Sequence, residues 1–166
     1  MKTLLLIFVL FFSTSALSAQ GPLPVGQNQL NVGFGLSSYW VPLYIGLDFG
    51  VHPDISVGLE ATFRPYDDIW RREFYRYLTV GFSGNGNYHF NRILYISPRW
   101  DLYAGLNVGF YLYDYPDGNP PSRTTGLGVG GQIGGRLYFT NNFGINLEFG
   151  GGNAFSGGKF GISVKL

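Results

Sequence analysis

Residues 101–112, DLYAGLNVGFYL, decide the fold of this chain. Every even position in this stretch is apolar, and every odd position is glycine, asparagine, aspartate or tyrosine. Successive side chains of a β-strand point to opposite faces, so a period of two marks a strand with two unlike faces. The stretch therefore predicts a strand with one apolar face and one face of mostly small or polar residues.

The same period recurs along the chain in seven further segments: residues 30–37, 43–51, 56–64, 78–88, 127–139, 143–149 and 159–166. Most of them have about the length that a tilted strand needs to cross a bilayer. Their second face is rich in glycine rather than in Lys and Glu, which suits the inside of a narrow barrel better than water. We predict an all-β fold, a transmembrane antiparallel up-and-down barrel of about eight strands. A soluble β-sandwich is the alternative.

The composition agrees with a membrane-facing wall. Of the 166 residues only 13% are charged and 18% are aromatic, whereas soluble domains carry about 25% charged residues. Several aromatic residues, such as Tyr39, Trp40, Trp70 and Trp100, lie near predicted strand ends, as in interfacial girdles. The chain has no cysteine, which excludes disulfides, and no basic block, which argues against nucleic acid as a partner.

The first residues have the layout of a secretory signal peptide. Lys2 precedes an unbroken apolar run from Leu4 to Phe12, and small or polar residues follow up to Ala19. This run is too short to cross a bilayer as a helix. We predict a signal peptide at residues 1–19 that is cleaved after Ser18 or Ala19, a flexible periplasmic lead-in at 20–28 and an outer-membrane barrel at 29–166, reached after Sec-type export.

The predicted connections alternate between short and long. Residues 52–54 and 140–142 are short turns, while 65–74, 114–123 and 150–158 are long. Because outer loops are usually the longer ones, we expect the first strand to rise from the periplasm. One connection does not fit, since residues 91–99 are long where a periplasmic turn is expected, and they could instead be an additional strand. Four residues of the outer loops are candidates for contact with a partner or with lipopolysaccharide, unless they are simply solvated: Trp70, Arg71, Arg72 and Asp117.

Six charged residues are predicted to face the barrel interior: Asp48, Glu60, Arg64, Arg136, Glu148 and Lys165. A narrow barrel is filled by side chains, and an unpaired charge there is costly, so these charges must pair. We expect Arg136 to reach Glu148, which lies diagonally across the predicted turn at 140–142, and to bridge toward Asp48 and Glu60. The interpretation is a packed plug of ion pairs; the alternative is a path for protons or ions.

The sequence contains no convincing cofactor or metal site. His52 and His89 have no second ligand at metal-binding spacing, and neither stands in a His-x-Ser pattern, so we interpret both as structural. Residues 126–131, GLGVGG, match a dinucleotide-binding pattern, but their glycines alternate with Leu127 and Val129 inside a predicted strand. We therefore predict no cofactor, no bound metal and no enzymatic activity.

The C-terminal segment resembles the signal by which the barrel-assembly machinery recognises the last strand of outer-membrane proteins. The residues that carry this resemblance are Lys159, Gly161, Val164 and Leu166. The signal usually ends in an aromatic residue, and Leu166 departs from that. An amphipathic last strand without a recognition role would show much of the same pattern.

Residues 28–166 as a whole resemble small outer-membrane β-barrel proteins of the OmpX/OmpA-like, porin-family type, in a style common in Bacteroidota. The resemblance rests on NYHF at 87–90 and DLYAGLNVG at 101–109. It implies a non-enzymatic role in envelope integrity, adhesion or an outer-membrane complex, with lipid, lipopolysaccharide, the assembly machinery and other envelope proteins as partners. Two rival functions remain, a lipid-modifying enzyme and a narrow solute pore.

Overall fold

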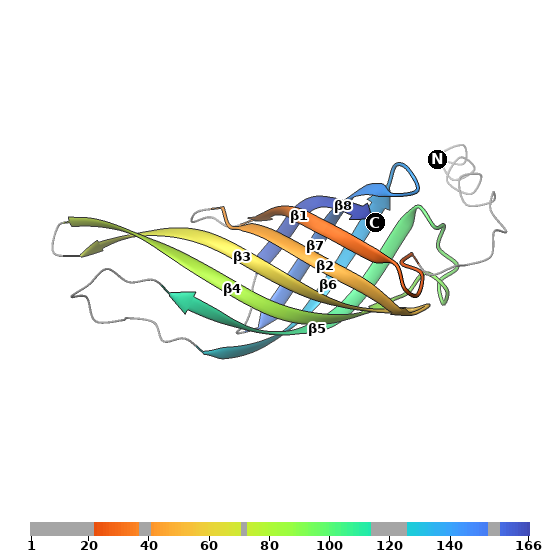
Figure 1. Cartoon of the computed structure of the whole chain (residues 1–166), viewed down its shortest axis with the longest axis horizontal. Coiled ribbons are helices and arrows are strands. Elements are labelled where there is room, and N and C mark those ends of the chain that lie inside the picture. The colour runs from red at the N-terminus through yellow and green to blue at the C-terminus, as the bar shows by residue number, and fades with distance from the viewer. Residues whose placement is uncertain (1–21, 37–40, 71–72, 114–125, 153–156) are drawn as a thin grey trace, which may run out of the picture.

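The computed structural model describes residues 22–36, 41–70, 73–113, 126–152 and 157–166, with the side chains of 66–77 and 113 left out. Eight antiparallel strands form one closed barrel in which each strand pairs with its neighbours in sequence and β8 closes onto β1 (Figure 1). The strands are β1 (Asn28–Leu36), β2 (Leu43–His52), β3 (Ile55–Trp70), β4 (Glu73–His89), β5 (Trp100–Tyr113), β6 (Leu127–Tyr138), β7 (Phe143–Gly152) and β8 (Gly157–Lys165).

This architecture confirms the predicted up-and-down barrel of eight strands. The connection at residues 91–99 contributes no additional strand and consists of turns. The glycine-rich stretch 126–131 runs into β6, as its alternation with apolar residues predicted. No helix in the described residues is long and apolar enough to cross a bilayer.

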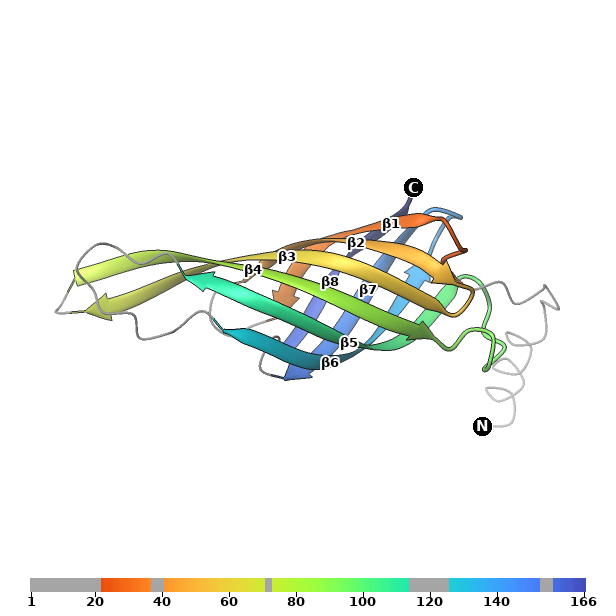
Figure 2. The same cartoon turned by 60° about the horizontal axis from the view of Figure 1, so that its bottom comes forward.

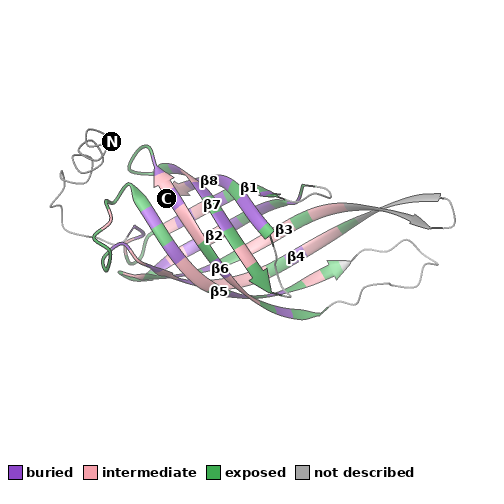
Figure 3. Ribbon diagram, turned by 180° about the vertical axis from the view of Figure 1, so that it is seen from behind, coloured by how far each residue is buried: buried purple, intermediate pink, exposed green. Residues whose placement is uncertain are grey.

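Buried and exposed residues alternate along the strands (Figure 3). The buried residues are mostly polar and lie inside the barrel, whereas the large exposed residues of the wall are apolar. Leu59, Leu106 and Leu127 are exposed on the outer wall, whereas Gln29, Asp101 and Ser163 are completely buried. A protein folded in water would show the opposite distribution. The distribution is instead that of a barrel whose wall faces hydrocarbon and whose narrow interior is filled by side chains.

Glycines on the inner face make room for these interior side chains. A Cβ at Gly134 would lie 2.3 Å from Cζ of Tyr103, and a Cβ at Gly58 would lie 2.2 Å from Oδ1 of Asp48. Both distances are far inside van der Waals contact, so no other residue fits at these two positions without displacing a side chain of the interior. Glycine in a strand commonly marks such a close approach.

The short turns and both ends of the described chain lie at one end of the barrel. The turns at 53–54 and 139–142 are here, and Leu166 N donates a hydrogen bond to Asn28 O at 2.9 Å. We assign this end to the periplasm, because periplasmic turns of such barrels are the short ones.

The lead-in was predicted to be flexible, but from residue 22 onward it packs against the barrel at the end where the short turns lie. Leu23 is buried, and Gly26 N donates to Gly50 O at 2.9 Å while Gly50 N donates to Gln27 O at 3.0 Å. The lead-in thus extends the pairing of β2, which holds it in place.

The hairpin of β3 and β4 is longer than predicted. Residues 65–74 were expected to form a loop, but β3 runs to Trp70 and β4 starts at Glu73. The last pair of β3 with β2 is Phe63 with Leu43, and the last pair of β4 with β5 is Thr79 with Tyr113. Beyond these pairs the hairpin projects past its neighbours at the end opposite the short turns (Figure 2). Pro65 and a run of charges hide the strand pattern in this part of the sequence.

Candidate functional site

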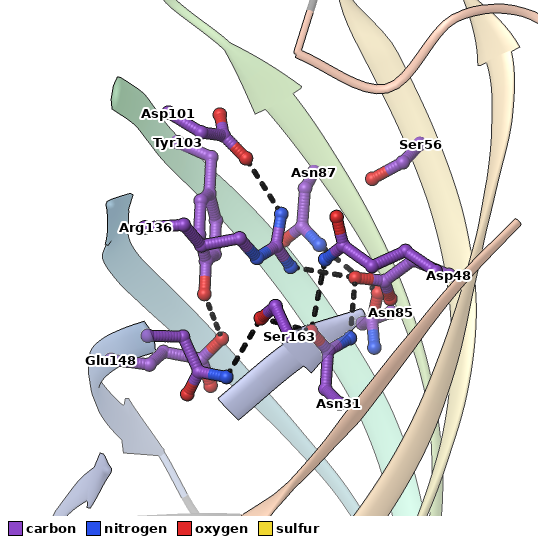
Figure 4. A network of polar contacts seen from close by, with 12 residues as sticks. Asn31, Asp48, Ser56, Asn85, Asn87, Asp101, Tyr103, Arg136, Glu148 and Ser163 are labelled. Atoms are coloured by element: carbon purple, nitrogen blue, oxygen red, sulfur yellow. Dashed lines mark hydrogen bonds and ion pairs between the residues drawn. The ribbon is translucent and has the colours of Figure 1, made fainter. Parts of the chain in front are cut away.

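A cluster of buried charged residues lies inside the barrel (Figure 4). At its centre Arg136 of β6 donates from Nη2 to Asp48 Oδ2 of β2 at 2.6 Å and from Nη1 to Asp101 Oδ2 of β5 at 2.7 Å. The side chains of Arg136, Asp48 and Asp101 are 3%, 4% and 0% exposed. Two carboxylates thus bind one guanidinium away from water.

Strand register explains this arrangement. Asp101 and Arg136 stand directly opposite each other on β5 and β6, and directly opposite side chains lie closer together than diagonal ones. The long arginine side chain then spans the lumen to Asp48. Its guanidinium also lies over the ring of Tyr103, 4.3 Å from the ring centre, in a cation–π contact that the dry interior strengthens.

A second ion cluster lies around Lys159 of β8. Its Nζ is 2.8 Å from Glu60 Oε2 of β3 and 2.7 Å from Glu148 Oε1 of β7. Glu148 stands directly opposite Lys159 in the sheet register. Tyr103 donates its hydroxyl to Glu148 Oε2 at 2.8 Å, and because its ring also contacts Arg136, it links the two ion clusters.

Neutral polar side chains extend this network around the barrel. Asn31 donates to Asp48 Oδ2 at 2.9 Å and accepts from Ser163 at 2.7 Å. Asn146 donates to Ser163 at 2.9 Å and accepts from the hydroxyl of Tyr44 at 2.6 Å. With the ion clusters, these contacts reach across the lumen and join every strand except β4, which is connected through the contact of His89 with Asp101.

The pairing of Arg136 differs from the prediction. Arg136 lies opposite Asn146 and diagonal to Glu148, as expected, but the predicted ion pair between Arg136 and Glu148 is wrong. Glu148 instead pairs with Lys159. Both arginine and glutamate have an opposite charge directly across a strand pair, and these direct partners outcompete the diagonal contact.

Arg136 was also expected to contact both Asp48 and Glu60, but these two carboxylates bind different cations. Arg136 binds Asp48, whereas Glu60 belongs to Lys159. Lys165, another residue of the predicted interior set, places its Nζ 3.8 Å from the centre of the Tyr138 ring. Arg64 lies on the part of β3 that extends past β2, outside both clusters.

Sequence reasoning missed two members of the network, Asp101 and Ser56, and gave Lys159 a different role, as part of the assembly signal. His89 was interpreted as structural, but its partners were not predicted. Parity was the signal that could have found them: Asp101 shares its face with Tyr103, and Lys159 shares its face with Ser163. All four side chains point inward and are buried.

Ser56, His89 and Asp101 stand in the order of a catalytic triad. His89 Nε2 is 2.9 Å from Ser56 Oγ, and His89 Nδ1 is 2.7 Å from Asp101 Oδ1. These are the contacts that activate a serine nucleophile. Here, however, Ser56 and His89 are only 1% and 2% exposed, so the hydroxyl is shielded from solvent. Asp101 is also shared with Arg136.

We interpret this trio as a hydrogen-bonded clamp between three adjacent strands, β3, β4 and β5. It lies toward the periplasmic end, because Ser56 and Asp101 are near the start of their strands and His89 ends β4. Buried polar networks of this kind fix one strand register when all members are satisfied.

Around the two ion clusters the described residues leave little free space. Two small cavities lie between the lumen side chains, of about 20 Å³ beside Arg136 and Glu148 and about 10 Å³ beside Thr62 and Tyr111. A single water needs roughly 10–15 Å³, so each has room for about one. Among the described residues, no group of three His, Asp or Glu side chains could hold a metal ion.

The remaining predicted residues are placed as follows. Arg71, Arg72 and Asp117 lie outside the described residues, and Trp70 is the last residue of β3. In β8 the backbone at Gly161 is close to that of β1, since a Cβ there would meet Val32 O at 2.3 Å. Nothing in the structure tests recognition of these C-terminal residues by an assembly machine, which stays a prediction.

Comparison with known proteins agrees with the fold. No family model and no curated protein matches the sequence. The similar solved structures include the N-terminal β-barrel domain of Pseudomonas aeruginosa OprF (13% identity, TM-score 0.62), the P. aeruginosa outer membrane protein OprG (12%, 0.63) and the Yersinia pestis outer membrane protein Ail (10%, 0.54). The matches cover 86%, 90% and 85% of this chain, and 98%, 99% and 99% of those chains.

The fold, the apolar outer wall and the polar interior together define the structural class of this chain. The chain has the fold of small eight-stranded outer-membrane β-barrels. At these identities the likeness extends to the fold alone, so function has to be argued from the chain's own residues.

Proposed function

We propose that this small outer-membrane barrel is a non-enzymatic scaffold that makes contacts at the cell surface, in adhesion or as an accessory subunit of an outer-membrane complex. The observation that carries the proposal is the β3–β4 hairpin, which extends past β2 and β5. A rigid, membrane-anchored wall that carries one long hairpin is suited to presenting that hairpin to a partner.

The backbone of the hairpin supports this role. Residues 64–70 pair with 73–79. In the described chain no strand pairs with the outer edge of β3 at residues 64–70 or with the outer edge of β4 at residues 73–78. Each edge therefore presents backbone N–H and C=O groups, which can accept a strand of another protein. The sequence here is rich in charge, with Asp67, Asp68 and Arg76 among others, and charge is a common way to keep an exposed edge from aggregating.

The interior argues against the rival function of a solute pore. The ion clusters of Arg136 and Lys159 cross the lumen, and the two small cavities beside them have room for about one water each. The buried serine of the Ser56–His89–Asp101 clamp argues against lipid modification at that position.

We infer the other partners from the class of fold and the sequence. The apolar wall is surrounded by lipid, with lipopolysaccharide next to the outer loops. The last strand, with Lys159, Gly161, Val164 and Leu166, would be presented to the barrel-assembly machinery after Sec-type export and removal of residues 1–19.

The experiment is co-purification from native outer membrane with a shortened hairpin. In the test variant residues 66–77 are replaced by the two-residue turn Asn-Gly, which favours tight hairpins. Covalent cross-linking and mass spectrometry identify the proteins bound to wild type and variant. Heat-modifiable gel mobility and the urea midpoint in lipid vesicles show that the barrel still folds.

We expect the cross-linked partners of the wild type to be lost from the folded, shortened variant. The variant that replaces Asn141 and Asn142 by Gly at the opposite end is the control and should keep them. A partner set that is unchanged by shortening the hairpin would contradict the proposal.

A further inference from the structure

The connection between β4 and β5 is long for the end of the barrel at which it lies. It covers residues 90–99, whereas the neighbouring turns at this end cover only 53–54 and 139–142. Short periplasmic turns are the rule in such barrels. The additional residues therefore need an explanation that the barrel itself does not supply.

The connection is held by its own hydrogen bonds. Leu94 N donates to Phe90 O at 2.9 Å, and Ile96 N donates to Asn91 O at 3.0 Å. The side chain of Asn91 is buried and contacts the backbone of Trp100 and Leu102 at the start of β5. These bonds give the segment a defined shape.

One ion pair also ties the connection to its neighbour. Arg92 Nη1 is 3.0 Å from Asp54 Oδ2 in the turn between β2 and β3. The segment is thus fixed both to the start of β5 and to the adjacent turn, and its surface residues are held in place.

Three consecutive residues of this connection expose apolar side chains. Ile93 and Leu94 are 61% and 58% exposed, and Tyr95 is 87% exposed. Tyr95 also has φ of +51°, in the left-handed region, where a residue other than glycine costs about 1 kcal/mol or more. A strained residue that displays an aromatic ring to the outside suggests a binding surface.

The apolar trio, Ile93, Leu94 and Tyr95, continues an aromatic belt on the outer wall. The rings of Tyr88 and Phe90 lie edge to face at 5.3 Å, just before the connection, and Trp100 is half exposed just after it. The next turn carries Phe139 and Phe143 with ring centres 6.4 Å apart. Aromatic rings at this level of a barrel lie at the boundary between hydrocarbon and headgroups.

The charges beside the trio complement a phospholipid surface. Arg92 and Arg99 are exposed on either side of it, and the sequence 90–100 contains no acidic residue. Arginine binds phosphate through two parallel hydrogen bonds, and its stem can lie along apolar surface while its head stays in water. Apolar centre, aromatic border and flanking guanidinium groups are together the chemistry of a lipid interface.

We propose that residues 90–100 form an anchor in the periplasmic leaflet of the membrane. Ile93, Leu94 and Tyr95 enter the boundary between headgroups and acyl chains, and Arg99 binds the phosphate of a phospholipid. Because residues 90–99 connect β4 and β5, the anchor fixes how deeply these two strands lie in the membrane.

The absence of cysteine from the chain allows a direct test. Leu94→Cys carries a single environment-sensitive nitrobenzoxadiazole dye, and the labelled protein is folded into vesicles of phosphatidylethanolamine and phosphatidylglycerol. Asn141→Cys is the matched control, because residue 141 is exposed in a turn at the same end of the barrel. Both dyes thus experience the same orientation in the vesicle.

Compared with the dye at 141, we expect the dye at 94 to emit at shorter wavelength and to be about fivefold less accessible to iodide, as for a side chain in the interfacial region. We also expect lipid that carries a nitroxide near the headgroup to quench the dye at 94. Arg99→Gln should weaken the lipid quenching at 94. Equal iodide accessibility at the two positions would overturn the proposal, since a surface meant for a soluble periplasmic protein stays in water when the purified barrel is alone.

Discussion

Replacing Arg136 by methionine removes the charge at the centre of the barrel while keeping a side chain of similar length. Asp48 and Asp101 then remain buried without the cation that both contact at 2.6 Å and 2.7 Å. Because the two carboxylates come from β2 and β5 and the arginine from β6, the substitution disconnects opposite sides of the barrel.

The size of the loss follows from the contacts that remain. Asp48 keeps the hydrogen bond from Asn31 at 2.9 Å, and Asp101 keeps its contact with His89 at 2.7 Å. Each carboxylate therefore retains one partner, and the cost is closer to that of one broken buried pair, about 3–5 kcal/mol, than to twice that value. This corresponds to a shift of the folding equilibrium by roughly 100-fold to a few thousand-fold.

The assay is urea unfolding in lipid vesicles, followed by tryptophan fluorescence and by heat-modifiable gel mobility. Arg92→Met is the matched control, because Arg92 forms an ion pair with Asp54 at 3.0 Å but is 45% exposed, and exposed pairs contribute about 0–1 kcal/mol.

A double-mutant cycle tests the coupling itself. Arg136→Met combined with Asp48→Asn should recover part of the loss, since the second substitution removes one of the two uncompensated charges. An unchanged urea midpoint for Arg136→Met, or strictly additive effects in the cycle, would refute the reasoning.

Three further predictions concern the second ion cluster, the buried serine and the signal peptide. Lys159→Met leaves Glu60 and Glu148 facing each other and should destabilise the barrel by about 3–5 kcal/mol. Lys165→Met removes a cation over the Tyr138 ring and should destabilise it by about 1 kcal/mol or less. Equal urea midpoints for the two variants would contradict this difference. Ser56→Ala removes one hydrogen bond to His89 and should cost about 1 kcal/mol, and the folded wild type should not react with a fluorophosphonate probe. Labelling of Ser56 in the folded barrel would instead show that the clamp is an accessible nucleophilic site. Intact-mass measurement of protein from outer-membrane fractions should show the loss of residues 1–18 or 1–19, and the mass of all 166 residues would rule the signal peptide out.

The barrel and its two faces were predictable because they depend on a period of two, which is a local property of the sequence. Leu102, Leu106 and Phe110 alternate with small and polar residues in a way that leaves little choice of inside and outside. The closure of eight strands follows, because an open edge in a membrane would leave backbone groups unpaired.

The partners inside the lumen were less predictable, because they depend on the register between strands that are distant in sequence. Parity places Arg136 and Glu148 on the inner face, but only the register puts Asp101 opposite Arg136 and Lys159 opposite Glu148. The contact between Arg136 and Asp48 crosses the lumen between strands that do not pair at all. No periodicity within one strand contains that information.

The hairpin was mispredicted for a different reason. Beyond Phe63 its two strands have no neighbours in the described chain, so no buried face imposes an alternation of apolar and polar residues. Pro65 and the charges that follow then resemble a loop, although the backbone of residues 64–70 pairs with that of 73–79.

The conductance of the purified barrel in planar lipid bilayers decides whether the lumen is closed. Arg136, Asp48 and Asp101, together with the cluster around Lys159, fill the lumen. We therefore expect no steady single-channel current through the wild type. Steady open-channel currents that disappear when the barrel is unfolded would show that the interior conducts and that the plug of ion pairs does not close it.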